Sequence, residues 1–326
     1  MKRLGNSTLD LTPVGLGAWA IGGEWRFGWG PQDDEDSIRT IRRAIDRGVN
    51  WIDTAAVYGL GHSEEVIGRA LRGVPAAERP YVFTKCSLIW DASGTVSHTL
   101  SPDAIRQEVE GSLRRLQVEK IDLYQIHWPE WPGSAPGHDP GRVEDAWEAL
   151  VSLKQSGKVS WIGVSNFNGE LLRRIQRIDQ PTSLQPPYSL LRREIEQDIL
   201  PFCRQQNIGV IPYSPMQSGL LTGKMTRERI AALPEGDWRR SGRFFQEPQL
   251  TQALALADRL AEIGRRHGRS AGEIALAWVL SNPAVTAVIV GARRPEQIDE
   301  LADAGSVRLA ADEIAELNGF ASATAG

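Results

Sequence analysis

Two features of the sequence predict an α/β fold of the (β/α)8 TIM-barrel class. Amphipathic helical patterns separate most members of a series of short apolar runs that end in polar residues. There are eight such runs, at residues 14–17, 50–53, 81–85, 122–127, 159–164, 183–185, 209–212 and 287–290. This alternation is typical of an eight-stranded barrel, although a doubly wound open sheet gives a similar pattern.

The helices are predicted from the spacing of their apolar residues. Ile38, Ile41 and Ile45 fall on one face of a helix that follows the first strand. Residues 103–116 repeat the same spacing through Ile105, Val109, Leu113 and Leu116.

Other segments depart from the regular repeat. Residues 3–11 predict a small N-terminal β-hairpin with its turn at Asn6 and Ser7. Two long βα loops are expected at about residues 89–100 and 214–247, and long loops without structure in a compact domain are usually functional. Since no shift in composition marks a boundary, residues 1–326 are predicted to form one domain.

Composition narrows the class of protein. Of the 326 residues, 41% are hydrophobic and 24% charged, and the net charge is −4. Basic pairs are scattered among acids, so we expect neither a nucleic-acid nor a membrane partner. Two cysteines, Cys86 and Cys203, lack metal-type spacing, which predicts no metal site and suits a reducing compartment. No apolar stretch resembles a signal or a membrane span, and we expect a cytoplasmic monomer or homo-oligomer.

Four chemically active side chains lie at the ends of three successive predicted strands. The second strand ends in Asp53, with Tyr58 five residues later; the third ends in Lys85 and the fourth in His127. In a barrel of this class, function gathers where strands end and βα loops begin. The sequence therefore predicts that these four groups meet at one rim.

This set of groups suits the reduction of a carbonyl. The carbonyl oxygen needs a proton, and a phenol with a pKa of about 10 is a poor acid unless a nearby ammonium lowers that value. A carboxylate would hold the lysine, and the imidazole would orient the carbonyl or share the proton transfer. Each residue alone has a structural explanation, such as Asp53 capping a turn or Lys85 reaching solvent. Their joint placement favours catalysis.

Several longer motifs extend this pattern along nearly the whole chain. They read NWIDTAAVYG at 50–59, FTK at 83–85, DLYQIHWP at 122–129, GVSNF at 163–167, YSP at 213–215, GLLTGK at 219–224 and GARRPEQ at 291–297. With these motifs the chain resembles the aldo-keto reductase superfamily, in particular the bacterial branch that is similar to potassium-channel β subunits.

The resemblance implies a role for each motif. Tyr58 would be the general acid, tuned by Lys85 and Asp53, and His127 would orient the substrate. The remaining motifs would hold a nicotinamide cofactor, with Ser165, Asn166 and Gln185 at the carboxamide, Tyr213 stacked on the ring, and Ser214, Pro215, Gly219 and Lys224 in the loop over the pyrophosphate.

The segment from Gly291 to Arg294 joins the last strand to a helix and favours NADP over NAD. Free N–H groups at a helix start and two adjacent guanidiniums, Arg293 and Arg294, suit a 2′-phosphate. A solvated arginine pair is the alternative. Gln297 and Glu300 would reach the 2′-phosphate and the adenine, whereas Leu301 stands where the family commonly has asparagine.

Eleven tryptophans suggest an aromatic pocket for an apolar substrate or a sugar ring. Trp25, Trp90 and Trp128 are expected to line it, beside a mobile rim loop at residues 130–138. The best-supported function is an NADP(H)-dependent reductase of an aldehyde, ketone or sugar carbonyl. Two alternatives stay open: an aldolase with Lys85 as Schiff-base nucleophile, and a cofactor-binding sensor subunit with little turnover.

Overall fold

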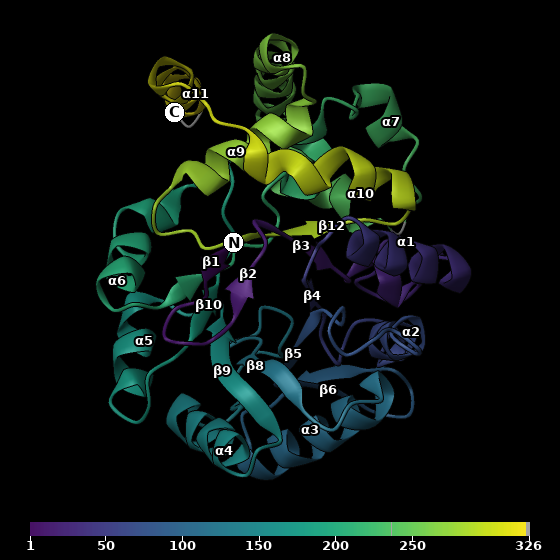
Figure 1. Cartoon of the computed structure of the whole chain (residues 1–326), viewed down its shortest axis with the longest axis vertical. Coiled ribbons are helices and arrows are strands. Elements are labelled where there is room, and N and C mark those ends of the chain that lie inside the picture. The colour runs from purple at the N-terminus through teal and green to yellow at the C-terminus, as the bar shows by residue number, and fades with distance from the viewer. Residues whose placement is uncertain (236, 324–326) are drawn as a thin grey trace.

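Eight parallel strands of the chain form a closed barrel (Figure 1). The computed structural model describes residues 1–235 and 237–323, with side chains through residue 320. Around the barrel the strands follow the order β11-β10-β9-β8-β5-β4-β3-β12. The ring closes between β11 and β12, where the Val210 carbonyl accepts a hydrogen bond from the Thr286 N–H at 2.8 Å. The α/β barrel predicted from the alternation is therefore confirmed.

The barrel strands coincide with the eight apolar runs of the sequence. Their bounds are β3 (Val14–Gly17), β4 (Trp51–Asp53), β5 (Tyr81–Cys86), β8 (Ile121–Ile126), β9 (Val159–Ser165), β10 (Ser183–Gln185), β11 (Gly209–Val210) and β12 (Val288–Gly291). Strand β11 is shorter than predicted, although main-chain hydrogen bonds continue beyond it, from the Tyr213 N–H to the Pro186 carbonyl and from the Ile289 N–H to the Pro212 carbonyl, both at 3.0 Å.

Helices cover the outside of the barrel (Figure 1). Their bounds are α1 (Asp34–Asp46), α2 (His62–Ala70), α3 (Pro102–Leu116), α4 (Val143–Gln155), α5 (Gly169–Gln176), α6 (Ile199–Gln205), α7 (Arg227–Ala231), α8 (Gln249–His267), α9 (Ala271–Ser281), α10 (Pro295–Leu301) and α11 (Ala311–Ala323). Both α8 and α11 are additions to the repeat, since α8 packs on α9 and α11 packs on α8.

The helix starts are set by local chemistry. The Asp33 carboxylate caps α1 by accepting the Asp36 N–H at 2.8 Å, and three acids occupy the first turn, where the helix dipole favours negative charge. Ile38 and Ile41 of this helix are buried, as their spacing predicts, whereas Ile45 is only partly buried.

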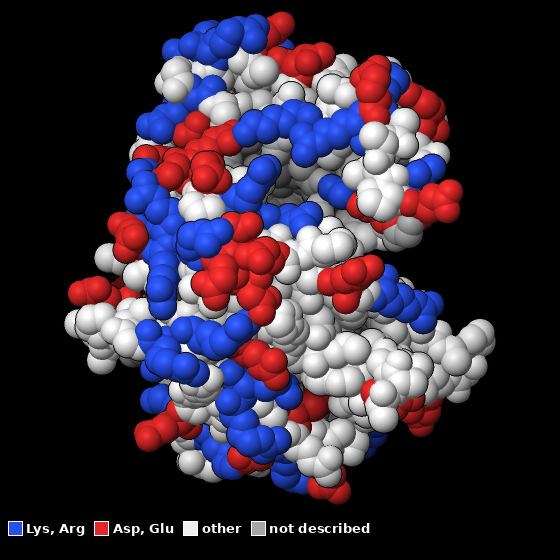
Figure 2. All heavy atoms as spheres, turned by 90° about the vertical axis from the view of Figure 1, so that its right-hand side faces the viewer, with Lys and Arg blue, Asp and Glu red and all other residues white. Residues whose placement is uncertain are grey.

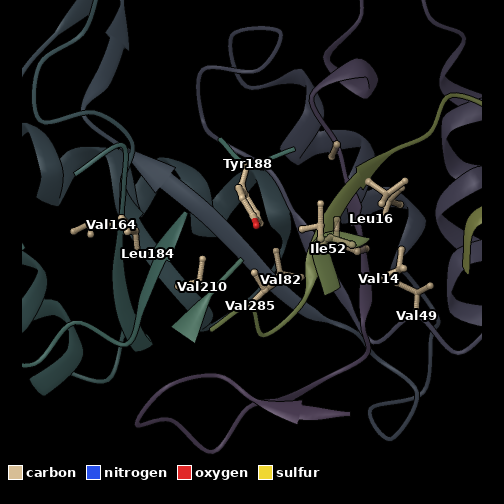
Figure 3. Close-up of a cluster of buried hydrophobic side chains, with 14 of the residues drawn as sticks. Val14, Leu16, Val49, Ile52, Val82, Val164, Leu184, Tyr188, Val210 and Val285 are labelled. Atoms are coloured by element: carbon tan, nitrogen blue, oxygen red, sulfur yellow. The ribbon is translucent and has the colours of Figure 1, made fainter. Parts of the chain in front are cut away.

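Alternation along the strands separates two sets of side chains. Ile52 faces outward with residues of the neighbouring strands, and these outward side chains pack against the helices (Figure 3). Trp51, one residue earlier, belongs to a second cluster inside the barrel with Phe83, Leu123 and Ile211. Because the period is two, Asp53 is in phase with Trp51 and lies above this inner apolar layer.

The N-terminal hairpin closes the bottom of the barrel. Strands β1 (Lys2–Arg3) and β2 (Asp10–Leu11) pair antiparallel, and Leu4, Leu9 and Leu11 join the inner apolar cluster. Gly15 is required here, because a Cβ at this position would lie 2.1 Å from the Trp51 ring. Within the described residues, no helix is both long and apolar enough to cross a membrane.

Both segments expected as long loops contain regular structure. The first forms a second hairpin, β6 (Leu88–Trp90) and β7 (Val96–His98), so the expectation of an unstructured segment was wrong. One carboxylate oxygen of Asp91 closes its turn by accepting the N–H groups of Ser93 and Thr95 at 2.9 and 3.0 Å. The second segment carries α7 and several single-turn 3-10 helices.

Candidate active site

A cavity of about 750 Å³ opens at the carboxyl ends of the barrel strands. Asp53, Tyr58 and His127 lie in its lining, and so do all thirteen residues that the sequence assigned to a cofactor. Figure 2, which shows the side bearing α1, α7 and α10, has a hollow with Lys and Arg atoms along it. The size is that of a site for a small molecule or cofactor.

Asp53 and Lys85 form a buried ion pair beneath this cavity. The Lys85 Nζ lies 2.5 Å from Asp53 Oδ1 and donates a second hydrogen bond to the Thr54 carbonyl at 2.7 Å. Only 1% of Lys85 and 2% of Asp53 is exposed. A buried charge is tolerated where it is paired and hydrogen-bonded, as both of these are.

Tyr58 and His127 sit above the pair. The Lys85 ammonium is 5.3 Å from the centroid of the Tyr58 ring, and the rings of Tyr58 and His127 meet edge to face at 5.7 Å. The four side chains predicted to meet therefore do meet, from the ends of β4, β5 and β8 and from the turn after β4.

The electrostatics differ from the expectation in one respect. The sequence predicts that Lys85 lowers the pKa of the Tyr58 phenol, whereas burial, with a smaller contribution from Asp53, raises that pKa well above its ordinary value. Removal of the phenol from solvent is the largest cause of this rise. Tyr58 accordingly holds its proton at neutral pH.

The other two bases of the site titrate below their ordinary values. Burial, followed by the nearby Lys85 charge, lowers the pKa of His127 well below 6.5, so its imidazole is neutral at pH 7. Burial also lowers the pKa of Lys85, an effect that Asp53 opposes. The site thus offers a protonated phenol beside a neutral imidazole.

Gln125, which the sequence did not single out, is fully buried inside the barrel. Its Nε2 lies 3.3 Å from Asp53 Oδ2, and the Gln185 Nε2 lies 2.8 Å from the same oxygen. The signal was present, since Gln125 precedes His127 by two residues and so points to the same side of β8. The two carboxamides leave Asp53 Oδ1 to Lys85.

Residues at the ends of β9 and β11 form a connected polar group along one wall. Ser165 Oγ donates to the Gln185 carbonyl at 2.8 Å, and Asn166 Nδ2 donates to the His127 carbonyl at 3.0 Å. Tyr213 Oη donates to Asn166 Oδ1 at 2.9 Å. Asn166 has a left-handed backbone, with φ of 63°. This strained turn aims its side chain across the strand ends.

The segment after β11 crosses the cavity. Ser214 and Gly219 both have positive φ, 53° and 95°, which bends the chain sharply over the cavity lining. At its far end the Lys224 ammonium pairs with the Glu300 carboxylate of α10. The two residues assigned to pyrophosphate and adenine are therefore linked to each other.

The arginines at the start of α10 differ in their surroundings. Arg293 donates from Nε to Gln32 Oε1 at 2.7 Å and from Nη1 to the Trp29 carbonyl at 3.2 Å, so it holds the loop after β3. Arg294 is exposed. The N–H groups of both arginines donate to Gln297 Oε1, at 2.8 and 3.2 Å. The free N–H groups expected from the sequence at these two positions are thus already occupied.

The tryptophans divide between wall and scaffold. Trp25 and Trp128 line the cavity, whereas Trp90 does not. Placing Trp90 in the pocket was therefore wrong: its ring packs against the Arg115 guanidinium at 5.5 Å because the hairpin turns it toward α3. The wall near Tyr58 is completed by four further residues that were not predicted as part of the pocket, namely Val57, Leu88, Val96 and Trp131.

Within the described part of the chain, no cluster of three or more His, Cys, Asp or Glu side chains could hold a metal ion. Cys86 and Cys203 are free and buried.

A barrel with these side chains at its carboxyl rim defines a class of oxidoreductases, and comparison with known proteins identifies the family. Residues 13–322 match the Aldo/keto reductase family. Aldo-keto reductase YhdN of Bacillus subtilis is 35% identical, over 97% of this chain and 91% of its own length. The NADH-specific methylglyoxal reductase of Escherichia coli is 34% identical, over 95% of each. The chain belongs to the aldo/keto reductase family.

Solved structures agree with this assignment. The glycerol dehydrogenase AKR11B4 from Gluconobacter oxydans has a TM-score of 0.88 and 38% identity, over 99% of this chain and 95% of its own. The aldo-keto reductase AKR11C1 from Bacillus halodurans, in its holo form, has a TM-score of 0.77 and 25% identity, over 98% and 95%. The family establishes oxidoreductase activity on carbonyls with a nicotinamide cofactor.

Proposed function

We propose that this protein is an NADP(H)-dependent reductase of aldehyde or ketone carbonyls, acting reversibly, with Tyr58 as general acid. The observation that carries the proposal is the closed Asp53–Lys85 pair directly beneath the Tyr58 ring, at 5.3 Å. A protonated phenol and a neutral imidazole then face the same cavity beside an aromatic wall.

The roles of the chain's own groups follow from their protonation states. Tyr58 donates its proton to the carbonyl oxygen, and the neighbouring Lys85 ammonium stabilises the resulting phenolate. His127, being neutral, orients the carbonyl without adding a positive charge. Asp53 keeps Lys85 in place through Oδ1 while Gln125 and Gln185 hold Oδ2. A nicotinamide dinucleotide bound in the cavity supplies the hydride.

The polar wall supports binding of that cofactor. Ser165, Asn166 and Gln185 would hold the carboxamide, and Tyr213 would pack against the ring. The segment that carries Ser214, Pro215, Gly219 and Lys224 would cover the pyrophosphate. Five basic side chains in the cavity lining support a 2′-phosphate, although Lys224 and Arg239 are each paired with an acid; they are Lys224, Arg229, Arg239, Arg293 and Arg294.

NADH is the alternative cofactor, and specific observations favour it. Arg293 already holds Gln32 and the Trp29 carbonyl, and the acids Asp33 and Asp36 line the same cavity. The E. coli relative is named as NADH-specific. We assign the 2′-phosphate to Arg294, which is exposed beside the cavity, more than to Arg293.

The structure argues against the aldolase alternative. A Schiff base needs a free amine that the substrate can reach. The Lys85 amine is fully enclosed, paired with Asp53 and bonded to the Thr54 carbonyl. The buried Lys85 amine does not argue against the alternative of a cofactor-binding sensor subunit. A measurement of turnover distinguishes that alternative from a reductase.

Two measurements test the proposal. Fluorescence titration with NADPH and NADH should show tighter binding of NADPH, and an Arg294→Ala variant should lose that preference. A panel of aldehydes, ketones and sugars, followed by NADPH absorbance, should show reduction of at least one class. Tight cofactor binding with no turnover across the panel would favour the sensor subunit instead.

A further inference from the structure

The wall of the cavity beside His127 is held from behind by a histidine that the proposed chemistry does not use. His98 ends β7 of the second hairpin and is 2% exposed. Its Nε2 lies 2.9 Å from the carbonyl oxygen of Trp128, the residue that follows His127. A carbonyl only accepts hydrogen bonds, so the imidazole must carry its proton on Nε2.

The other ring nitrogen of His98 is buried without a partner among the described residues. In the neutral tautomer that nitrogen is a bare lone pair, whereas protonation would leave a buried N–H with nothing to accept it. Burial, with a further contribution from His138, lowers the pKa of His98 and opposes protonation; Trp128 and Glu130 act in the opposite sense. The His98 ring is therefore neutral, and it donates one hydrogen bond, from Nε2.

Other contacts hold the same stretch of main chain. Ser87 Oγ lies 3.3 Å from the Trp128 N–H and 3.4 Å from its carbonyl, so the His98 bond is the shortest of the three. Ser87 itself has a left-handed φ of 84°, and its N–H is shared by both carboxylate oxygens of Glu108, each at 3.1 Å. A third histidine, His138, binds the His98 carbonyl at 2.6 Å and docks the following loop on the hairpin.

His127 is fixed independently of this brace. The main-chain N–H of His127 donates to the Cys86 carbonyl at 3.1 Å, and the main-chain carbonyl of His127 accepts from Asn166 Nδ2 at 3.0 Å. Loss of the His98 contact should therefore release Trp128 more than it releases His127. Trp128 packs with Leu88, Val57 and Trp131 in the wall near Tyr58.

We propose that His98 is a positioning residue that sets the substrate wall by anchoring the main chain of Trp128 from the β6–β7 hairpin. The proposal rests on the proposed carbonyl reduction for its kinetic consequence, but the anchor is a property of the folded chain. Two amide substitutions separate the anchor from simple packing. Glutamine places an Nε2 donor where the imidazole has its Nε2, whereas the asparagine donor falls near the position of Nδ1.

The kinetic test compares His98→Gln with His98→Asn using benzaldehyde as the probe. Loss of the shortest hydrogen bond to the Trp128 carbonyl, which leaves it only the 3.4 Å contact with Ser87 Oγ, should raise KM roughly tenfold in His98→Asn. We expect a much smaller change in kcat and an unchanged Kd for NADPH by fluorescence titration. His98→Gln should keep KM within about twofold of the wild type.

A second readout does not depend on turnover. Amide hydrogen exchange of Trp128, Glu130 and Trp131 should become faster in His98→Asn and stay near the wild-type rate in His98→Gln. Equal KM and equal exchange in all three proteins would overturn the proposal. Equal impairment of both variants would also overturn it, because it would assign His98 to packing alone. If the wild type reduced no carbonyl, the proposed function would fail while the exchange experiment still decided the anchor.

Discussion

The buried ion pair of Asp53 and Lys85 makes the stability of the fold depend on both partners. Each charge is almost completely removed from solvent, so neither partner can be lost without leaving the other unpaired. Asp53→Asn and Lys85→Met should each lower the free energy of unfolding by about 3 to 5 kcal/mol. The double variant should recover much of that loss, since it buries no charge.

Denaturant unfolding of the four proteins measures this coupling. Lys85→Met and the double variant should lack carbonyl reduction, because the Tyr58 phenolate would have no ammonium beside it. Asp53→Asn keeps the ammonium but loses the carboxylate that holds it in place, and its rate of reduction should fall as well. Strictly additive losses in the double variant would show that the two side chains do not act as a pair.

Glu108 carries a pH dependence of stability at the residue scale. Burial raises the pKa of this carboxyl to about 8, although the Ser87 N–H opposes the shift. The folded protein therefore keeps this proton up to about pH 8, whereas the unfolded chain releases it above about pH 4.3. Below the pKa of Glu108 in the unfolded chain, the contribution of this group to the free energy of unfolding is complete. That contribution is lost as the pH rises through 8, the pKa in the folded protein.

Glu108→Gln cannot ionise and should remove this dependence. We expect the denaturant concentration at the midpoint of unfolding to decrease when the pH is raised from about 6 to about 9 in the wild type. The decrease should be smaller in Glu108→Gln. The same fall in both proteins would assign the loss to other groups.

At the scale of elements, the β6–β7 hairpin is the part of the barrel that shapes the substrate side. It supplies Leu88 and Val96 to the cavity and His98 to the support behind it. Leu88→Ala should enlarge the cavity near Tyr58. The ratio of kcat/KM for bulky aldehydes to kcat/KM for small ones should therefore rise by about tenfold.

Leu100→Ala is the matched control for this change. Leu100 is 1% exposed, packs in the outer apolar cluster and is not part of the cavity lining. Both variants lose the same atoms, so both should lose stability, but only Leu88→Ala should change the ratio. A similar change of ratio in both would remove the hairpin from substrate selection.

The sequence predicted the barrel elements well because each has a strong period. Strand β5 alternates Val82 outward and Phe83 inward, and α1 places Ile38 and Ile41 on one face. The second hairpin was missed because its two short strands lie outside the alternation of barrel strands and helices. Such short strands depend on the turn at Asp91 and on packing, neither of which shows as a period.

For the whole molecule, the sequence predicted which residues meet better than it predicted what they do there. Strand ends place Asp53, Lys85 and His127 together because all parallel strands present their carboxyl ends at one rim. Contacts between side chains that are far apart in the sequence cannot be predicted from local patterns such as periodicity. The bond from Arg293 to Gln32 and the packing of Trp90 on Arg115 therefore needed the fold.

In the proposed reaction, Tyr58 delivers the proton to the carbonyl oxygen. The most direct measurement is single-turnover reduction of an aldehyde by Tyr58→Phe, with NADPH binding measured in parallel. Tyr188→Phe is the control, since it removes a buried phenol hydroxyl bonded to Glu196 outside the cavity. We expect a loss of at least about a hundredfold for Tyr58→Phe with unchanged NADPH affinity, and a normal rate for the control. A near-normal rate for Tyr58→Phe would contradict this role of Tyr58.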